Sequence, residues 1–442
     1  MEPATYLGRA DAGTSPAGGR AVLVGIEIKG HSSAWTVQDS LDELGQLAIT
    51  AGLSVAAGTY QKLAHPDPST YVGSGKVREL KELVAAEDAG YAVFDDELSP
   101  GQHRKIEKVL GPGVRIIDRT RLILDIFSLH ARSREGKLQV ELAQYQYILP
   151  RLAGMRTDLA QQVGGAGAGP VGLRGPGETQ LELDRRQIRR RIQTIRTALE
   201  DVRTRRLQHR KQRDKSGIPV VAIVGYTNAG KSSLLNALTG AGVLVQDKLF
   251  ATLDPTTRRL TLPSGREVLL TDTVGFIRKL PHDLVAAFRG TLEGIEEASL
   301  ILQVVDASHP RTAEQIQAVD SVLEDLAVHA TPRLIVWNKT DLLPDGIPPA
   351  VLSPSHPQAV AVSARTGANL GGLLETVQQM LADSLVSVEA LIPYHRYDLV
   401  TLVYEKGSVE LREETGEGVR LRASVPRALA ERLAGYTVDG RG

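Results

Sequence analysis

The sequence contains no cysteine among its 442 residues. Disulfide bonds, thiolate metal sites and thiol nucleophiles are therefore excluded, and the composition is compatible with a reducing compartment. The formal net charge is zero, because 52 Lys and Arg balance 52 Asp and Glu. The overall charge thus indicates no class of partner, and local runs of charge must be considered instead.

Long apolar segments are also missing. No apolar run approaches the roughly 18 residues that span a bilayer, and the start Met1-Glu2-Pro3 lacks the basic-then-apolar order of a signal peptide. We expect a soluble, cytoplasmic protein without a membrane span, with peripheral membrane association left open. The composition is that of an ordinary globular protein, and the length predicts several domains.

The first 130 residues predict a leader and a small α/β domain. Residues 1–19 are rich in Gly, Ala, Ser and Thr, which favours a disordered leader. In residues 20–130, helical periodicity alternates with short apolar runs at 21–26, 53–56, 91–94 and 114–117. Strands and helices taking turns are typical of a parallel sheet.

Residues 131–216 differ in kind, because apolar residues recur at alternating steps of four and three in two successive segments. These residues are Leu138, Leu142, Tyr145, Leu149 and Leu152, then Leu181, Ile188, Ile192, Ile195, Leu199 and Val202. Two heptad-like seams predict an antiparallel helical hairpin. The glycine-rich stretch 164–177 between them predicts a flexible tip.

The second arm of this hairpin carries a local excess of positive charge. From Asp184 to Lys215 there are thirteen Lys and Arg but four Asp and Glu. Such a run suits contact with a phosphate backbone, although a solvated helix face is the alternative. The candidate RNA-binding residues are Arg174 in the tip and Arg185, Arg186, Arg189 and Arg190 in the arm.

A nucleotide-binding motif follows in residues 217–384. The apolar run 220–224 leads into Gly225-Tyr226-Thr227-Asn228-Ala229-Gly230-Lys231-Ser232, which matches G-x-x-x-x-G-K-[ST]. The two glycines let successive N–H groups face an anion, and Lys231 reaches the outer phosphates. Ser232 supplies a hydroxyl to Mg²⁺. A strand before the motif and a helix after it make a chance match improbable.

Two further segments predict contacts with Mg²⁺ and the γ-phosphate. In Asp272-Thr273-Val274-Gly275, the carboxylate can hold Mg²⁺ through water and the Gly275 N–H can sense the γ-phosphate. Thr252 lies twenty residues after Ser232, in the expected first switch loop. We expect its hydroxyl to be the second direct protein ligand of Mg²⁺ when GTP is bound.

The base is predicted to be guanine. The strand 334–337 ends in Asn338-Lys339-Thr340-Asp341, whose carboxylate can accept from guanine N1–H and N2–H₂, donors that adenine lacks. The run 360–362 precedes Ser363-Ala364-Arg365, which places a backbone N–H near guanine O6. All these motifs follow predicted strands in the correct order, as ligands of open α/β sheets require.

The predicted site is therefore extensive. Lys231, Thr252 and Gly275 are the candidate catalytic residues. The predicted GTP-binding residues are Gly225, Tyr226, Thr227, Asn228, Ala229, Gly230, Lys231, Ser232, Ser233, Phe250, Ala251, Thr252, Leu253, Asp254, Asp272, Thr273, Val274, Gly275, Asn338, Lys339, Thr340, Asp341, Ser363, Ala364 and Arg365. A second phrase, Gly73-Ser74-Gly75-Lys76, is followed by Val77 and is interpreted as a turn before a helix, with nucleotide contact as the alternative.

The last segment, 385–442, predicts a small α+β domain. Strand-like runs at 399–403 and 419–423 flank a turn at 414–418, and a helix passes through Leu429 and Leu433. The predicted fold class is therefore α/β: a Ras-like P-loop GTPase domain with an N-terminal α/β domain, an antiparallel helical hairpin and this C-terminal domain.

Several of these segments together resemble the HflX GTPases. The resemblance is carried by residues 94–99, 134–144, 174–182, 225–232, 249–256 and 272–277. It implies a ribosome-associated GTPase that binds the large subunit and its RNA and inserts the hairpin tip toward the peptidyl-transferase centre. It further implies that the protein separates stalled ribosomes into subunits, and we expect a monomer.

One departure from the Ras pattern concerns the attacking water. Phe276 stands where Ras-like enzymes carry a water-orienting Gln. The water must then be held by backbone, by a partner or by an added cation, so we expect slow intrinsic turnover that the ribosome stimulates. In other GTPases with an apolar residue here, an Asn placed like Asn228 can coordinate K⁺.

Two other functions are compatible with the sequence. One is an assembly factor that checks large-subunit RNA without separating subunits. The other is an RNA remodelling enzyme whose N-terminal domain binds a second nucleotide such as ATP. Binding restricted to immature subunits would favour the first, and ATP turnover that survives Lys231→Ala would favour the second.

Overall fold

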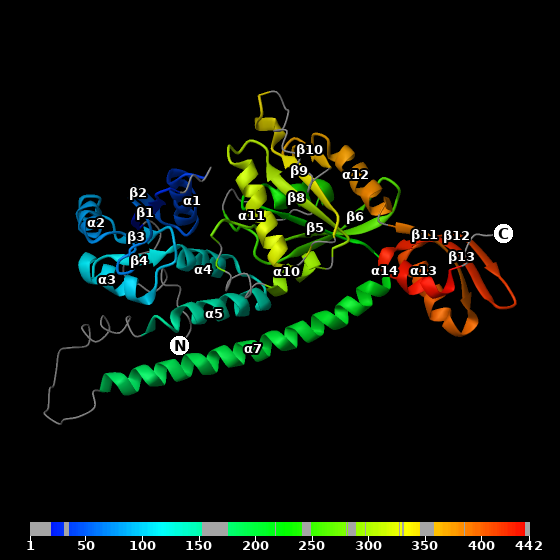
Figure 1. Cartoon of the computed structure of the whole chain (residues 1–442), viewed down its shortest axis with the longest axis horizontal. Coiled ribbons are helices and arrows are strands. Elements are labelled where there is room, and N and C mark those ends of the chain that lie inside the picture. Colours follow the sequence, from blue (N-terminus) through cyan, green and yellow to red (C-terminus); the bar gives the residue numbers. More distant parts are fainter. Residues whose placement is uncertain are drawn as a thin grey trace. The chain divides into compact units, whose positions relative to one another are not determined.

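The computed structural model describes residues 19–30, 35–152, 176–216, 218–240, 249–279, 281, 289–296, 298–326, 328, 331–344, 358–383 and 385–437 (Figure 1). Most of the predicted leader and hairpin tip, including Arg174, lie outside them. The chain divides into two compact units. The first contains Met1–Asp201, Gln246–Asp254 and Ile277–Thr291, and the second contains the remainder. Among the described helices, none is both long and apolar enough to cross a membrane.

The N-terminal sheet is four-stranded and parallel, with strand order β2-β1-β3-β4. Its strands are β1 (Arg20–Ile28), β2 (Ser54–Leu63), β3 (Tyr91–Phe94) and β4 (Arg115–Asp118). The helices that alternate with them are α1 (Val37–Thr50), α2 (Ser74–Ala86) and α3 (Pro100–Leu110). β3, inside the sheet, is buried at every position, as expected for a parallel strand covered on both faces. The expected alternation of strands and helices is confirmed.

Within the described residues, the helices α4 (Arg119–His130), α5 (Arg134–Ile148) and α7 (Pro176–Ser216) follow this sheet. α4 is buried along most of its length and is capped by Asp118, whose carboxylate accepts from the Arg121 N–H. α5 and α7 supply the two predicted arms of the hairpin. A shared cluster contains eight of the predicted seam residues: Leu138, Leu142, Tyr145, Leu149, Ile188, Ile192, Ile195 and Leu199. The heptad pattern therefore does mark the packed faces of these helices.

The second unit contains a six-stranded sheet with order β10-β9-β8-β5-β7-β6. Its strands are β5 (Val220–Gly225), β6 (Thr256–Thr261), β7 (Glu267–Asp272), β8 (Leu300–Asp306), β9 (Arg333–Asn338) and β10 (Ala359–Ala361). Only the β6–β7 pair is antiparallel among the described pairs of this sheet. The associated helices are α8 (Lys231–Thr239), α10 (Arg289–Glu296), α11 (Thr312–Asp325), η1 (Thr340–Leu342) and α12 (Leu370–Asp383).

The C-terminal domain pairs a three-stranded antiparallel sheet with helices. Its elements are β11 (Leu385–Pro393), η2 (Tyr394–Arg396), α13 (Tyr397–Lys406), β12 (Ser408–Glu414), β13 (Gly418–Pro426), α14 (Arg427–Leu433) and η3 (Ala434–Tyr436). The expected strand at 399–403 is wrong, because these residues lie in α13. Leu399, Val400 and Val403 are buried together at helical spacing, which a short apolar run cannot reveal. The expected turn and final helix are confirmed.

Candidate GTP-binding site

The P-loop depends on two glycines with positive φ. Gly225 has φ of 154°, and an added Cβ would lie 2.3 Å from the Val304 carbonyl oxygen. Gly230 has φ of 92°, and its Cβ would lie 2.2 Å from the Asn338 side-chain nitrogen. Side chains at these positions would clash with neighbouring elements of the same sheet. The loop can therefore bring its N–H groups to the start of α8 only with glycine at both positions.

Lys231 extends back along this loop. Its Nζ donates to the carbonyl oxygens of Tyr226 at 2.8 Å and Gly225 at 3.3 Å. Burial lowers the pKa of Lys231 to about 8, although the nearby Asp272 carboxylate opposes this shift. A bound phosphate would give the buried ammonium an anionic partner that two neutral carbonyls cannot match.

The hydroxyl and carboxylate predicted for Mg²⁺ lie together. Ser232 Oγ donates to Asp272 Oδ2 at 2.6 Å, and Asp272 is fully buried at the end of β7. Oxygen ligands of this type, with room for water, are those Mg²⁺ prefers. Ser232 and Asp272 therefore fit a site for this ion.

The segment after β7 is joined to the P-loop by a short parallel bridge. The Phe276 N–H donates to the Gly225 carbonyl at 3.0 Å, and the Thr227 N–H donates to the Phe276 carbonyl at 2.7 Å. A Cβ at Gly275 would lie 2.9 Å from Lys231 Nζ. The bridge brings the predicted γ-phosphate sensor beside the predicted phosphate-binding lysine. The sequence does not indicate this bridge, because the pairing of Tyr226 with Phe276 depends on the order of the strands in the sheet.

Phe276 itself is 1% exposed. Its ring therefore lies in the protein interior and offers no group to an attacking water. This burial agrees with the expectation that something other than the residue after Gly275 must hold that water.

The base-recognition motifs also converge. Asn338 at the end of β9 donates through Nδ2 to the Ala229 carbonyl and accepts through Oδ1 from the Ala364 N–H, each at 3.0 Å. Ser363 Oγ donates to Asp341 Oδ1 at 2.6 Å. Asn338 thus links the P-loop to the segment predicted to face guanine O6, and Ser363 orients the predicted guanine-binding carboxylate.

Lys339 has a partner that the sequence did not reveal. Its backbone has φ of 62°, and its Nζ lies 2.7 Å from Asp306 at the end of β8. Asp306 also accepts from Ser308 Oγ at 2.6 Å. Asp306 is the last residue of β8, which lies beside β9 in the sheet, so strand order would have indicated that Asp306 and Lys339 are neighbours.

The predicted first switch loop belongs to the other compact unit. Phe250 is buried there, and the Asp254 carboxylate accepts from the N–H groups of Arg132 and Ser133 at 2.8 Å each. The contact of Asp254 with GTP stays a prediction. So does ligation of Mg²⁺ by Thr252.

The candidate RNA-binding arginines of α7 lie on the solvent side. Arg186, Arg189 and Arg190 are exposed, and Arg185 is partly exposed. Their neighbour Arg191 instead binds Glu141 of α5, with 2.7 Å between Nε and Oε1. Arg191 therefore joins the two arms of the hairpin, whereas the candidate RNA-binding arginines are accessible to a partner.

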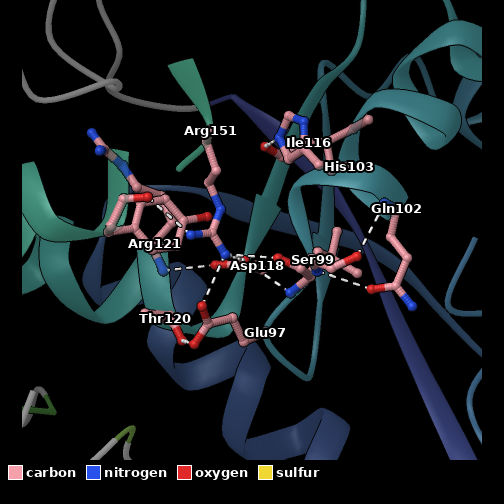
Figure 2. Close-up of polar contacts among 11 residues, drawn as sticks. Glu97, Ser99, Gln102, His103, Ile116, Asp118, Thr120, Arg121 and Arg151 are labelled. Carbon is pink, nitrogen blue, oxygen red and sulfur yellow. Dashed lines mark hydrogen bonds and ion pairs between the residues drawn. The ribbon is translucent and has the colours of Figure 1, made fainter. Parts of the chain in front are cut away.

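Arg151, three residues after the end of α5, joins a polar cluster of the N-terminal domain in which Arg151 and Asp118 are buried and Glu97 is exposed (Figure 2). Arg151 donates to Glu97 at 2.9 Å and to the Leu98 carbonyl at 2.7 Å. The Asp118 carboxylate accepts from the N–H groups of Leu98 and Arg121. Burial raises the pKa of Asp118, while these hydrogen bonds and Arg151 oppose the rise. The cluster therefore connects the segment that follows α5 to the N-terminal domain.

The second Gly-Lys phrase precedes α2. The Gly73 N–H donates to Gln61 Oε1 at 2.8 Å, and Lys76 Nζ binds Glu79 at 2.6 Å. The Gly73 N–H and the Lys76 ammonium are therefore both engaged within the domain. The interpretation as a turn before a helix is confirmed, because α2 begins at Ser74, and nucleotide contact stays the alternative.

Four family models match the chain in sequence order. They are described as GTP-binding GTPase N-terminal over residues 38–128, GTP-binding GTPase Middle Region over 130–213, 50S ribosome-binding GTPase over 220–339 and HflX C-terminal domain over 353–435. Together these matches include residues of the N-terminal domain, both hairpin arms, the P-loop domain and the C-terminal domain.

Relatives that match over nearly their whole length belong to the HflX GTPases as well. A GTPase HflX from Caldanaerobacter subterraneus is 46% identical over 95% of this chain and 94% of its own length. The GTPase HflX of Escherichia coli K12 is 43% identical over 93% of this chain and 94% of its own. A solved GTP-binding protein from Sulfolobus solfataricus in complex with GDP is 25% identical, with a TM-score of 0.42, and covers 83% of this chain and 99% of its own. The family models and the HflX relatives, together with a complete set of guanine-nucleotide motifs, establish that the chain belongs to the HflX family of GTPases and hydrolyses GTP.

Proposed function

We propose that this GTPase binds the large ribosomal subunit and separates stalled ribosomes into subunits, with GTP as the switch. The exposed arginines of α7 are the observation that carries the proposal, because they offer positive charge to an RNA backbone. The match of residues 220–339 to the 50S ribosome-binding GTPase model supports the same partner. The glycine-rich tip then has the separate task of acting on the site that the arm reaches.

The GTP site would work as follows. Lys231 would bind the outer phosphates, the Gly275 N–H would bind the γ-phosphate, and Asp341 would select guanine. Ser232 and Thr252 would hold Mg²⁺ directly and Asp272 would hold it through water. When bound, this ion neutralises charge on the phosphate oxygens. Thr252 would make its contact only in the GTP state, which would give the protein two distinguishable states.

Sedimentation tests the proposed function. Whole ribosomes incubated with the protein and GTP should convert to free subunits, and the protein should travel with the large subunit in a non-hydrolysable analogue. GDP should release it. If whole ribosomes stay intact and the protein binds only immature large subunits, the splitting function is contradicted and an assembly role is favoured.

We also expect hydrolysis to depend on K⁺. The buried Phe276 offers no group to the attacking water, and Asn228 stands in the P-loop where other GTPases with an apolar residue at the position of Phe276 can coordinate K⁺. Hydrolysis in K⁺ should exceed that in Na⁺ at equal ionic strength by about 10²-fold, the scale of one lost transition-state donor. Asn228→Ala should remove the difference. Equal wild-type rates in the two salts would exclude the cation.

A further inference from the structure

The first switch loop is buried against the N-terminal part of the chain on both sides of Thr252. The Phe250 ring packs edge-on against Phe127 of α4, with 4.7 Å between the centroids. Phe250 is 2% exposed and Leu253 is 1% exposed. All these residues belong to one compact unit. Thr252 is therefore flanked by side chains that restrict the loop to a narrow range of conformations.

Asp254 adds a polar anchor two residues after Thr252. Its carboxylate accepts from the N–H groups of Arg132 and Ser133 at 2.8 Å each, and from the Ser133 hydroxyl. Ser133 is also the N-cap of α5. A carboxylate is favoured at the start of a helix by unpaired N–H groups and by the helix dipole. Hydrogen bonds to an ionised acceptor are also the stronger kind.

Gly136 provides the space for this carboxylate. It lies in the first turn of α5, and an added Cβ would be 2.5 Å from Asp254 Oδ1 and 3.1 Å from Ser133 Oγ. No real Cβ tolerates the first of these distances, so even alanine at position 136 would displace the Asp254 carboxylate. Alanine is nevertheless a better helix former than glycine, so α5 itself should not be weakened.

We propose that the contact of Asp254 with Ser133 and Gly136, at the start of the first hairpin arm, positions Thr252 and thereby sets the preference of the site for GTP over GDP. This inference rests on the proposed role of Thr252 as a ligand of Mg²⁺ in the GTP state. A loop without the anchor would lose conformational entropy when GTP ordered it, and this loss would weaken GTP binding. An anchored loop has lost that entropy before GTP binds. GDP does not require the Thr252 contact. Asp254 and Gly136 are thus positioning residues.

Gly136→Ala tests the inference, and Gly101→Ala is its matched control. Gly101 lies in the first turn of α3, also capped by a serine, Ser99, whose hydroxyl accepts from the Gln102 N–H (Figure 2). An added Cβ there would meet nothing nearer than 3.9 Å. The affinity of Gly136→Ala for a non-hydrolysable GTP analogue should fall relative to that for GDP by about fivefold or more, the lower end of couplings between sites. Gly101→Ala should keep the wild-type ratio.

A second variant identifies the cause of the change. In an Asp254→Ala background, Gly136→Ala should have little further effect, because the group that its methyl displaces is absent. Hydrogen exchange of the nucleotide-free protein gives a reading independent of GTP. The peptide spanning residues 249–254 should exchange faster in Gly136→Ala than in the wild type or in Gly101→Ala.

The outcomes separate this inference from the role of Thr252. If Thr252→Ala lowers the GTP-to-GDP affinity ratio but Gly136→Ala does not, the anchor has no positioning role. A GTP-to-GDP affinity ratio above that of the wild type in Gly136→Ala would mean that the anchor keeps Thr252 away from Mg²⁺. This result would also overturn the inference. If Thr252→Ala itself leaves the ratio unchanged, the ligand assignment fails, and the inference fails with it.

Discussion

Replacing Asp341 with asparagine should move the preference of the GTPase from guanine to xanthine nucleotides. The carboxylate can accept from both N1–H and N2–H₂ of guanine, whereas an amide can donate to the 2-oxo group of xanthine. Because a mismatch between polar groups of site and base discriminates strongly, the ratio of kcat/KM for GTP over XTP should change by about 10⁴-fold. Paired hydrolysis assays with the two nucleotides measure this change.

Ser363→Ala is the informative companion to this variant. It removes the 2.6 Å hydrogen bond that Ser363 Oγ donates to Asp341 Oδ1, but it leaves the acid in place. Guanine binding should weaken without a gain in xanthine binding, because orientation is lost and charge is kept. An Asp341→Asn protein that still prefers GTP would disprove the assignment of Asp341.

The convergence of the GTP motifs could be predicted from the sequence, because each motif follows an apolar run. In a parallel sheet the carboxyl ends of the strands meet at one edge. The end of β5 therefore carries Gly225, the end of β7 carries Asp272 and the end of β9 carries Asn338. Local patterns were sufficient here because one topological rule converts them into proximity.

Contacts between residues that no such topological rule brings together could not be predicted from the sequence. The carboxylate of Asp254 meets Ser133, which lies 121 positions earlier in the chain, and neither residue stands in a pattern that indicates the other. The prediction of a strand at 399–403 was wrong for a different reason. Five residues of strand-like composition can equally form one buried face of a short helix. Tertiary packing decides both cases.

If the hairpin acts on ribosomal RNA, changes in its basic arm and changes in its tip should impair different activities. Neutralising Arg185, Arg186, Arg189 and Arg190 should weaken binding to the large subunit and flatten its dependence on salt. Each lost phosphate contact should reduce the slope of log affinity against log salt by about one unit. Arg191→Gln is a useful comparison, because this arginine binds Glu141 within the hairpin and should change the salt slope less.

Replacing residues 164–177 with a Gly/Ser segment of equal length should have the opposite profile. Most of the affinity for the large subunit should remain, because the arginines of α7 are intact. Separation of ribosomes should be lost and ribosome-stimulated GTP hydrolysis should fall, while nucleotide affinity should not change because the P-loop lies in residues 225–232. Sedimentation and stimulated-hydrolysis assays on the same preparation measure all of these quantities.

The replacement distinguishes a specific tip from a simple linker. A linker has only to join two helices, and any flexible chain of that length would serve. A tip that acts on RNA needs its own side chains, Arg174 among them, at the position set by the hairpin arms. The contacts of Arg151 with Glu97 and Leu98 lie outside the replaced segment, so the replacement leaves them unchanged. Full splitting activity in that protein would therefore show that the sequence of the tip has no specific role.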